Sequence, residues 1–339
     1  MGTEHEGGGG PPVGPQLEAH YRFHDVGLTL SADQPWLLDA AESVLSPMAR
    51  TTSPEGERRA KVTVSARSIE PYIPEDLHDR IEIRFRHFST TCYTADGDLW
   101  LMDDGVVVRM PRDSGECTAW VRESAHTNPS GYVGALIVTV IELFRHLGLY
   151  QLHAGCVSKD DRCVLFCGGQ QHGKSTATIA MARSGWHCVT DDLLYLRDQM
   201  DGTVGGQGWR EDFNVGQATQ AAFELSQHVG SLRHDGRHTM DPSIFSFADD
   251  SVPVRPTHLV FTRIAHTDRS VLEPVARADA LSRMIQYSPM VLVAGRRAGE
   301  HLDLLRRVVL QCQCFDLHAG RDVLEGHLPS MLQPIFQAP

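Results

Sequence analysis

One short segment combines glycines, a lysine and a serine at the spacing of a phosphate-binding loop. It spans residues 168–175 and fits the pattern G-x-x-x-x-G-K-[ST]. Glycines let the backbone curl so that successive N–H groups point at one phosphate. The lysine reaches the β- and γ-phosphates, and the serine hydroxyl ligates Mg²⁺. We therefore expect a nucleotide to be bound by Gly168, Gly169, Gln170, Gln171, His172, Gly173, Lys174, Ser175 and Thr176.

The elements that flank this loop are the ones that a phosphate site needs. Residues 162–167 form a short apolar run that predicts a buried strand. Residues 174–184 predict a helix, and Gly185 follows where it can end that helix. A strand, a glycine loop and a helix together place the phosphates at a helix N-terminus. The alternative is a chance match in a glycine-containing turn, which this context disfavours.

A pair of adjacent carboxylates follows the next predicted strand. Residues 187–190 predict this strand, and Asp191 and Asp192 come directly after it. One carboxylate there can hold Mg²⁺ across the β- and γ-phosphates, while the other accepts the proton of an attacking hydroxyl. An isolated Asp-Asp pair is more often a turn or a helix cap, but its place after a phosphate-loop unit favours the functional interpretation.

Three further side chains are weaker candidates. His153 precedes the loop strand in the segment LHAGCV, where an imidazole can contact the γ-phosphate or tune a carboxylate, although a structural histidine is the alternative. Arg210 and Arg237 lie in the polar segment 201–250, which we expect to hold a mobile substrate loop. A cation there can neutralise a transferring phosphate, and we favour Arg237, although solvated surface is the default interpretation.

Composition excludes several other classes of protein. The chain has 339 residues, of which 41% are hydrophobic, and 31 Lys and Arg against 43 Asp and Glu give a net charge of −12. No basic excess is available to neutralise nucleic acid or an anionic membrane. The most apolar stretch, residues 132–144, is too short to cross a bilayer. Eight cysteines form no CxxC pair, and Cys312 and Cys314 are only a weak metal or redox candidate. We expect a cytoplasmic protein.

The chain divides into three predicted parts. Residues 1–19 predict a disordered tail, 20–149 a β-rich (α+β) N-terminal domain with a linking helix, and 150–337 an α/β domain that carries the loop. Asp96-Gly97 and Asp104-Gly105 have the residues of tight hairpin turns. The expected strands of the first domain are 22–30, 60–66, 81–88, 99–102, 106–110 and 118–122, and its expected helices are 35–45 and 131–147. The expected later elements are a strand at 257–264, helices at 277–287 and 299–309, a strand at 312–317 and a helix within 321–336.

At this point the chain resembles a known family. The segments LHAGCV, CVLFCGGQQHGKST and GWHCVTDDLLYL, within residues 150–196, are similar to the core of the HPr kinase/phosphorylase-like group. The resemblance implies a P-loop kinase core of the HPr kinase C-terminal type, similar to that of phosphoenolpyruvate carboxykinase. It implies ATP and Mg²⁺ as cofactors, with Lys174 and Ser175 binding phosphate and metal. By position, Asp191 is the leading candidate base, Asp192 a metal or orienting partner, and His153 a phosphate contact.

Relatives in this group phosphorylate serine hydroxyls on the carrier protein HPr, on peptides or on small molecules. Three departures disfavour HPr as the acceptor here: Gln171 replaces a usual glycine, Thr176 replaces an acidic residue, and the N-terminal half differs. We therefore expect a kinase that acts on a serine of a peptide or protein. The alternatives are a small-molecule kinase of the same fold and a nucleotide-binding regulatory protein without turnover. Relatives often assemble into homo-oligomers, but no interface is defined by the sequence.

Overall fold

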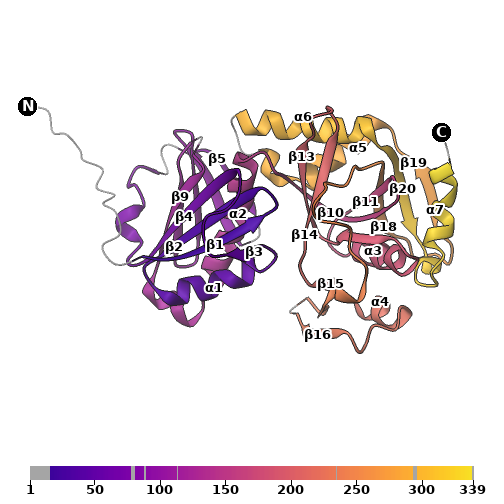
Figure 1. The fold of residues 1–339 in the computed structure, drawn as a ribbon, viewed down its shortest axis with the longest axis horizontal. Coiled ribbons are helices and arrows are strands. Elements are labelled where there is room, and N and C mark those ends of the chain that lie inside the picture. Colours follow the sequence, from indigo (N-terminus) through magenta and orange to yellow (C-terminus); the bar gives the residue numbers. More distant parts are fainter. Residues whose placement is uncertain are drawn as a thin grey trace, which may run out of the picture. The chain divides into compact units, whose positions relative to one another are not determined.

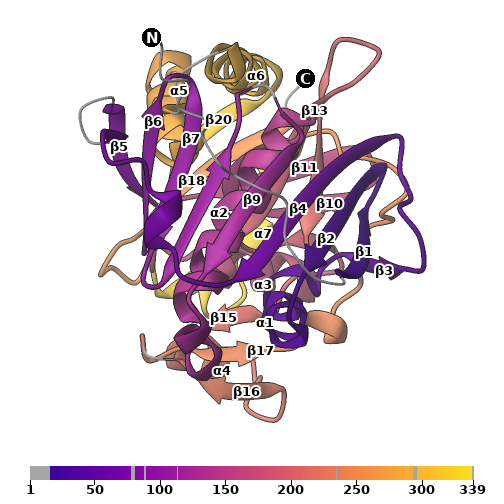
Figure 2. The same ribbon diagram turned by 90° about the vertical axis from the view of Figure 1, so that its left-hand side faces the viewer.

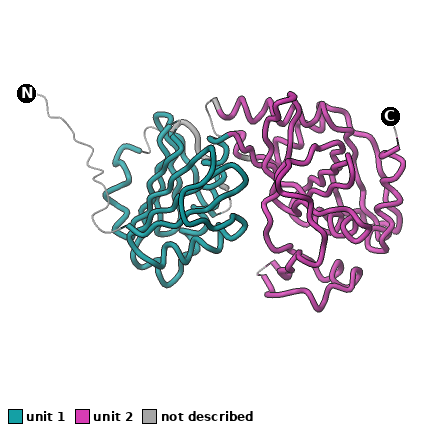
Figure 3. Tube along the Cα trace, in the orientation of Figure 1, with its two compact units in different colours: residues 1–147, 293–295 teal, residues 148–292, 296–339 magenta. Residues whose placement is uncertain are grey.

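The computed structural model describes residues 16–77, 81–87, 89–112, 114–233, 235–292 and 296–337. Two compact units make up the chain, the first ending at Leu147 and the second beginning at Gly148 (Figure 3). Each unit contains a large β-sheet with helices packed on it, so the fold is mixed α/β. Within the described residues, no helix combines the length and the apolar character that crossing a membrane requires.

The first unit is built on a nine-stranded sheet with the order β3-β1-β2-β4-β9-β8-β7-β6-β5. Helix α2 packs against strands β6 to β9, while α1 packs against β1, β2 and α2 (Figure 2). The strands are β1 (Leu17–Phe23), β2 (Val26–Ala32), β3 (Ala49–Thr51), β4 (Arg58–Ala66), β5 (Ile81–His87), β6 (Thr90–Ala95), β7 (Asp98–Asp103), β8 (Val106–Met110) and β9 (Glu116–Val121). The helices are α1 (Pro35–Leu45) and α2 (Ser130–His146).

Several predictions for this unit are confirmed, and two are corrected. Helix α1 has the predicted bounds, and turns at Asp96-Gly97 and Asp104-Gly105 join the antiparallel strands β6, β7 and β8. The single strand predicted at 22–30 is instead a hairpin, because His24 adopts a positive φ of 55° and reverses the chain between β1 and β2. The predicted tail overlaps β1, which begins at Leu17; residues 1–15 lie outside the described residues, as does Phe88 of the strand predicted at 81–88.

The second unit contains an eight-stranded sheet with the order β14-β13-β10-β11-β18-β20-β19, and β12 also pairs with β10. Strands β11, β18 and β20 are parallel to one another. The main-sheet strands are β10 (Tyr150–Lys159), β11 (Arg162–Cys167), β12 (His187–Thr190), β13 (Leu193–Asp198), β14 (Val204–Trp209), β18 (His258–Ile264), β19 (Val271–Pro274) and β20 (Gln313–Ala319). A separate small sheet has the order β15-β17-β16, formed by β15 (Phe213–Val215), β16 (Val229–Leu232) and β17 (His238–Met240).

Helices cover both faces of the main sheet, and strand β11 shows why (Figure 1). Its residues alternate between two apolar cores: Cys163, Leu165 and Cys167 pack with residues of α5 and α6, while Val164 and Phe166 pack with residues of α3 and α7. Side chains alternate between the faces of a strand, so a strand between two helical layers is apolar throughout. The helices are α3 (Lys174–Arg183), α4 (Gln217–Ala222), α5 (Arg277–Gln286), α6 (Arg296–Gln311) and α7 (Leu328–Gln337).

One prediction for this unit needs correction, and one segment has more regular structure than its weak periodicity indicates. The segment 201–250 contains β14, α4 and the small sheet, whose apolar residues pack on α3. The helix expected within 321–336 begins only at Leu328. Asp322 is held by hydrogen bonds from the backbone and hydroxyl of Ser270, and Gly326 has a positive φ of 84°, so the chain between them cannot be a continuous helix.

Candidate functional site

The glycine loop connects the end of β11 to the start of α3, as the sequence predicts. Gly173 has a φ of 93° and Gln171 a φ of 61°. Both therefore lie in the left-handed region, which glycine adopts without strain and glutamine does not. The usual glycine that Gln171 replaces would meet this requirement without cost. The loop thus keeps its curled backbone despite an unfavourable residue at this position.

Lys174 turns back onto the loop that it follows. Its side-chain ammonium donates hydrogen bonds to the carbonyl oxygens of Gly168, at 2.9 Å, and Gly169, at 3.1 Å. Only 6% of the residue is exposed, and burial lowers the pKa of its ammonium. The lysine charge is therefore held inside the loop by neutral acceptors, which an anionic ligand can replace.

His172 covers the opposite side of the same loop. Its Nδ1 accepts a hydrogen bond of 3.1 Å from the backbone N–H of Gly169. The ring also lies so close to Gly169 that a Cβ built there would meet it at 3.1 Å. His172 thus occupies one of the backbone donors of the loop in this structure.

The Asp-Asp pair lies beside the loop because two short strands pair with the same neighbour. Strands β12 and β13 both run antiparallel to β10, and the two aspartates form the break between them. Ala154 of β10 pairs with Cys167, the residue that precedes the loop. Gly155 permits the close packing here, since a Cβ at this position would lie 2.4 Å from the hydroxyl of Thr178.

Asp191 is the inner carboxylate of the pair. It is 4% exposed. Burial, together with the negative charge of Asp192, raises the pKa of Asp191 to about 8 from its ordinary value of 3.8, while the hydroxyl of Ser175 and the charge of Lys174 oppose this shift. At neutral pH the carboxyl group of Asp191 is therefore largely protonated in this structure.

Asp192 is the outer carboxylate, and its side chain is 49% exposed. Its Oδ1 lies 3.2 Å from Nδ1 of His153, which is on the adjacent strand β10. The backbone holds both residues in place: Ala154 N–H donates to the carbonyl of Asp192, and His153 N–H donates to the carbonyl of Tyr287, each at 3.0 Å. Burial lowers the pKa of His153, although the charge of Asp192 acts in the opposite direction.

The described residues contain no group of three or more His, Cys, Asp or Glu side chains arranged to hold a metal ion. Mg²⁺, however, commonly uses one or two protein oxygens together with waters and substrate phosphates. Ser175 and Asp191 offer a hydroxyl and a carboxylate oxygen, and the hydroxyl is near enough to lower the pKa of the carboxyl group, so the two residues fit such an ion.

The two candidate arginines are in different surroundings. Arg237 lies between β16 and β17. Burial is the main cause that lowers the pKa of Lys174 and His153, and the charge of Arg237 adds to it in both cases. The charge of Arg237 therefore acts on the site. Arg210 does not join this cluster, because it donates to the carbonyl of Ala248, pairs with Asp250 and stacks 4.3 Å over the ring of Phe247.

Sequence reasoning missed two acidic residues near the site. Glu211 accepts a hydrogen bond of 2.6 Å from the indole N–H of Trp209, and its charge adds to the raised pKa of Asp191, whose main cause is burial. Asp235 is paired with Arg237. Glu211 could have been identified from the sequence, because it follows Arg210 directly and lies close to the end of an apolar strand. Asp235 lies in a polar segment that contains no recognisable motif, so the sequence did not identify it.

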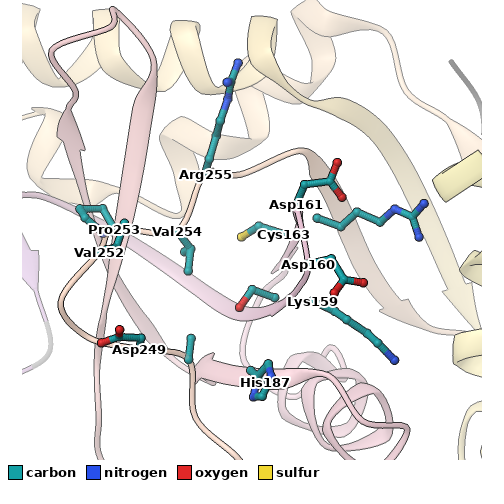
Figure 4. Close-up of a pocket in the computed structure, with 13 residues that line it drawn as sticks. Lys159, Asp160, Asp161, Cys163, His187, Asp249, Val252, Pro253, Val254 and Arg255 are labelled. Carbon is teal, nitrogen blue, oxygen red and sulfur yellow. The ribbon is translucent and has the colours of Figure 1, made fainter.

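A second hollow lies at the other end of strand β11. It has a volume of about 320 Å³ and is lined mainly by the β10–β11 turn and residues 248–255. The six residues of β11 place it about 17 Å from the glycine loop. Figure 4 shows that the charged ends of Lys159, Asp161 and Arg255 point away from one another, so they do not converge on a common ligand.

Comparison with known proteins gives no family assignment. No protein-family model matches the chain, and no curated protein matches it. Among solved structures, the chain is similar to the Hpr(Ser) kinase/phosphatase from Coxiella burnetii, with a TM-score of 0.27 and 11% identity over 56% of this chain and 99% of that one. Similarity at this level defines neither the fold nor the activity of the chain.

Proposed function

We propose that the chain is an ATP-dependent phosphotransferase that moves the γ-phosphate onto a hydroxyl group, with a serine of a peptide or protein as the acceptor. The observation that carries this proposal is a convergence of side chains beside strands β10 and β11. A buried lysine in a glycine loop and a buried carboxylate lie near a half-exposed carboxylate that is paired with a histidine. These are the groups that phosphoryl transfer to a hydroxyl requires.

The glycine loop binds the triphosphate in this proposal. The ammonium of Lys174 exchanges its carbonyl acceptors for phosphate oxygens, which form stronger, charge-assisted hydrogen bonds. The N-terminus of α3 adds backbone N–H donors and a favourable dipole. The side chain of His172 moves off Gly169 or rotates to let phosphate approach this N–H.

We assign the metal to Asp191 rather than to Asp192, which reverses the roles expected from sequence. In phosphate-loop proteins, the loop serine and a carboxylate beside it hold Mg²⁺ between the β- and γ-phosphates. Asp191 is buried and its ionised form is favoured by the hydroxyl of Ser175, whereas the side chain of Asp192 is 49% exposed. Bound Mg²⁺ supplies charge stabilisation, and it requires Asp191 to be ionised.

Asp192 is then the general base. Its carboxylate is accessible to an acceptor and is oriented by the contact with His153. As the acceptor oxygen forms its bond to the γ-phosphorus, the hydroxyl proton passes to Asp192. The bond between the γ-phosphorus and the β–γ bridging oxygen breaks, and ADP leaves with that oxygen. Arg237, whose charge acts on Lys174, is the cation that would neutralise charge on the transferring group.

The test is mass spectrometry of candidate acceptors incubated with the purified protein, ATP and Mg²⁺. The acceptors are a pool of serine-containing peptides and hydroxyl metabolites. We expect one phosphate to be added to a peptide, and we expect Lys174→Ala to abolish this addition. The control is Lys159→Ala, which should retain it, because Lys159 is exposed and ends β10 beside the first residue of β11. Transfer to a metabolite alone would select a small-molecule kinase. ATP binding without any transfer or hydrolysis would refute the proposed activity.

A further inference from the structure

The small sheet β15-β17-β16 is labelled in Figure 2, and Arg237 directly precedes its strand β17. This sheet is fixed to the helix that follows the glycine loop. Apolar residues of the segment, among them Phe213 and Met240, share one core with Ala177 and Ile179 of α3. The turn that bears the arginine is therefore part of the packed structure around the loop.

Hydrogen bonds lead from the loop helix to this turn. The hydroxyl of Thr176, one residue after Ser175, lies 2.8 Å from the hydroxyl of Thr219 in α4. The next residue, Gln220, donates to the carbonyl of Val215 and contacts the ring of His238, each at 2.9 Å. His238 follows Arg237 directly in the chain. A short series of contacts thus fixes the backbone at Arg237 relative to the phosphate loop.

Asp235 holds the side chain of Arg237. Its Oδ2 accepts hydrogen bonds from Nε, at 2.9 Å, and Nη2, at 2.6 Å, while its Oδ1 accepts from the backbone N–H of Arg237 at 3.1 Å. The Asp235 side chain is only 12% exposed and that of Arg237 24% exposed, although Gly236 between them is exposed. The pair is thus directed toward the protein rather than toward solvent.

These contacts leave the guanidinium able to bind a second anion. A guanidinium has five N–H donors in a planar fork. Asp235 uses the side formed by Nε and Nη2, so the side formed by Nη1 and the outer Nη2 hydrogen can bind phosphate at the same time. A carboxylate that fixes one edge of an arginine also fixes the direction of the other edge.

We propose that Asp235 is a positioning residue that directs the guanidinium of Arg237 at the terminal phosphate of a nucleotide bound in the glycine loop. This inference rests on the proposed function. Asp235 touches neither nucleotide nor acceptor, and it acts only through Arg237. Its loss leaves the arginine charge in place but returns the side chain to many rotamers, so the contact with the terminal phosphate weakens.

The experiment measures dissociation constants of Mg·ATP and Mg·ADP by calorimetry, for the full chain and four variants. Their ratio isolates contacts to the terminal phosphate, because the rest of the nucleotide is common to both. The variants are Arg237→Ala, Asp235→Asn, the double variant and Arg233→Gln, which removes an exposed arginine from the same turn. Asparagine at 235 can still accept the backbone N–H, so the turn is retained.

We expect Arg237→Ala and Asp235→Asn each to lower the preference for ATP about tenfold, the effect of one charge-assisted hydrogen bond. The double variant should match Arg237→Ala, and Arg233→Gln should match the wild type. ADP affinity should stay constant throughout, which a general loss of structure would not allow.

Other outcomes overturn the inference. An unchanged or increased ATP preference in Asp235→Asn would show that Asp235 does not position Arg237. An additional effect of Asp235→Asn in the Arg237→Ala background would show that Asp235 acts independently. A wild type that binds neither nucleotide would refute the proposed function, and the inference would fall with it.

Discussion

Replacing Asp191 by asparagine should change the pH dependence of stability in a predictable direction. Asp191 is buried, and its pKa in the folded protein is raised to about 8 from 3.8. The folded state therefore keeps a proton on Asp191 at pH values where the unfolded state has lost it. The stability contributed by this neutral carboxyl group is complete below about pH 4 and is lost as pH rises toward 8.

The size of the effect follows from linkage. Over the window between the two pKa values, the free energy of unfolding falls by about 1.4 kcal/mol for each pH unit on account of this one group. Asparagine has nearly the same shape as a protonated aspartate and carries no titratable proton. The stability of Asp191→Asn relative to the wild type should therefore increase by about 3 kcal/mol between pH 5 and pH 7.

Urea denaturation of the full chain in metal-free buffer, at pH 5, 6 and 7, measures this difference. Asp161→Asn is the matched control, because this aspartate is exposed in the β10–β11 turn, at the end of β11 opposite to the glycine loop. We expect the free-energy difference between wild type and this control to vary much less with pH. Parallel stability curves for wild type and Asp191→Asn would refute the reasoning, since they would mean that Asp191 is already ionised in the folded protein at pH 5.

Four other changes have defined outcomes. Mg²⁺ should bind more tightly as pH rises from 6 to 8 in the presence of ATP, because metal and proton compete for Asp191, and calorimetry with Asp191→Asn should show a weaker dependence on pH. Gln171→Gly should not destabilise the protein and should relieve about 1 kcal/mol of backbone strain, measured by urea denaturation, because φ is 61° there. Gly208→Ala should lower the free energy of unfolding by more than about 3 kcal/mol in the same assay, because the added Cβ would lie 2.1 Å from the carbonyl oxygen of Val189. A decrease of less than about 1 kcal/mol would contradict this packing. Thr176→Ala and Thr219→Ala should show a coupling of about 1 kcal/mol in a double-mutant cycle, and additive effects would argue against their hydrogen bond.

Elements with strong local signals were predictable from sequence. Helix α1 begins at Pro35, a residue favoured in the first turn of a helix, and has the predicted bounds. Strand β12 and the strand–loop–helix around Gly168 are also where the pattern places them. In each case a turn-forming residue or an apolar run marks the point where the helix or strand begins or ends. The neighbouring residues alone are therefore enough to predict these elements.

Structures that depend on distant contacts were not predictable. Strands β15 and β17 have three residues each, which is too short for a periodic pattern, and they form because Phe213 and Met240 pack with residues of α3. The same limit applies to the candidate site. The sequence identifies Asp191 and Asp192 as a pair, but their roles depend on which one contacts Ser175, and only the pairing of β12 and β13 with β10 decides that.

Hydrogen exchange with mass spectrometry locates a bound nucleotide on the chain, and it therefore tests whether the glycine loop is the nucleotide site. We expect Mg·ATP to slow amide exchange in the peptides that contain residues 168–176 and 235–238, and we expect Lys174→Ala to abolish this protection. Exchange in the hollow formed by the β10–β11 turn and residues 248–255 should not change. Protection of that hollow with none at the glycine loop would contradict the account.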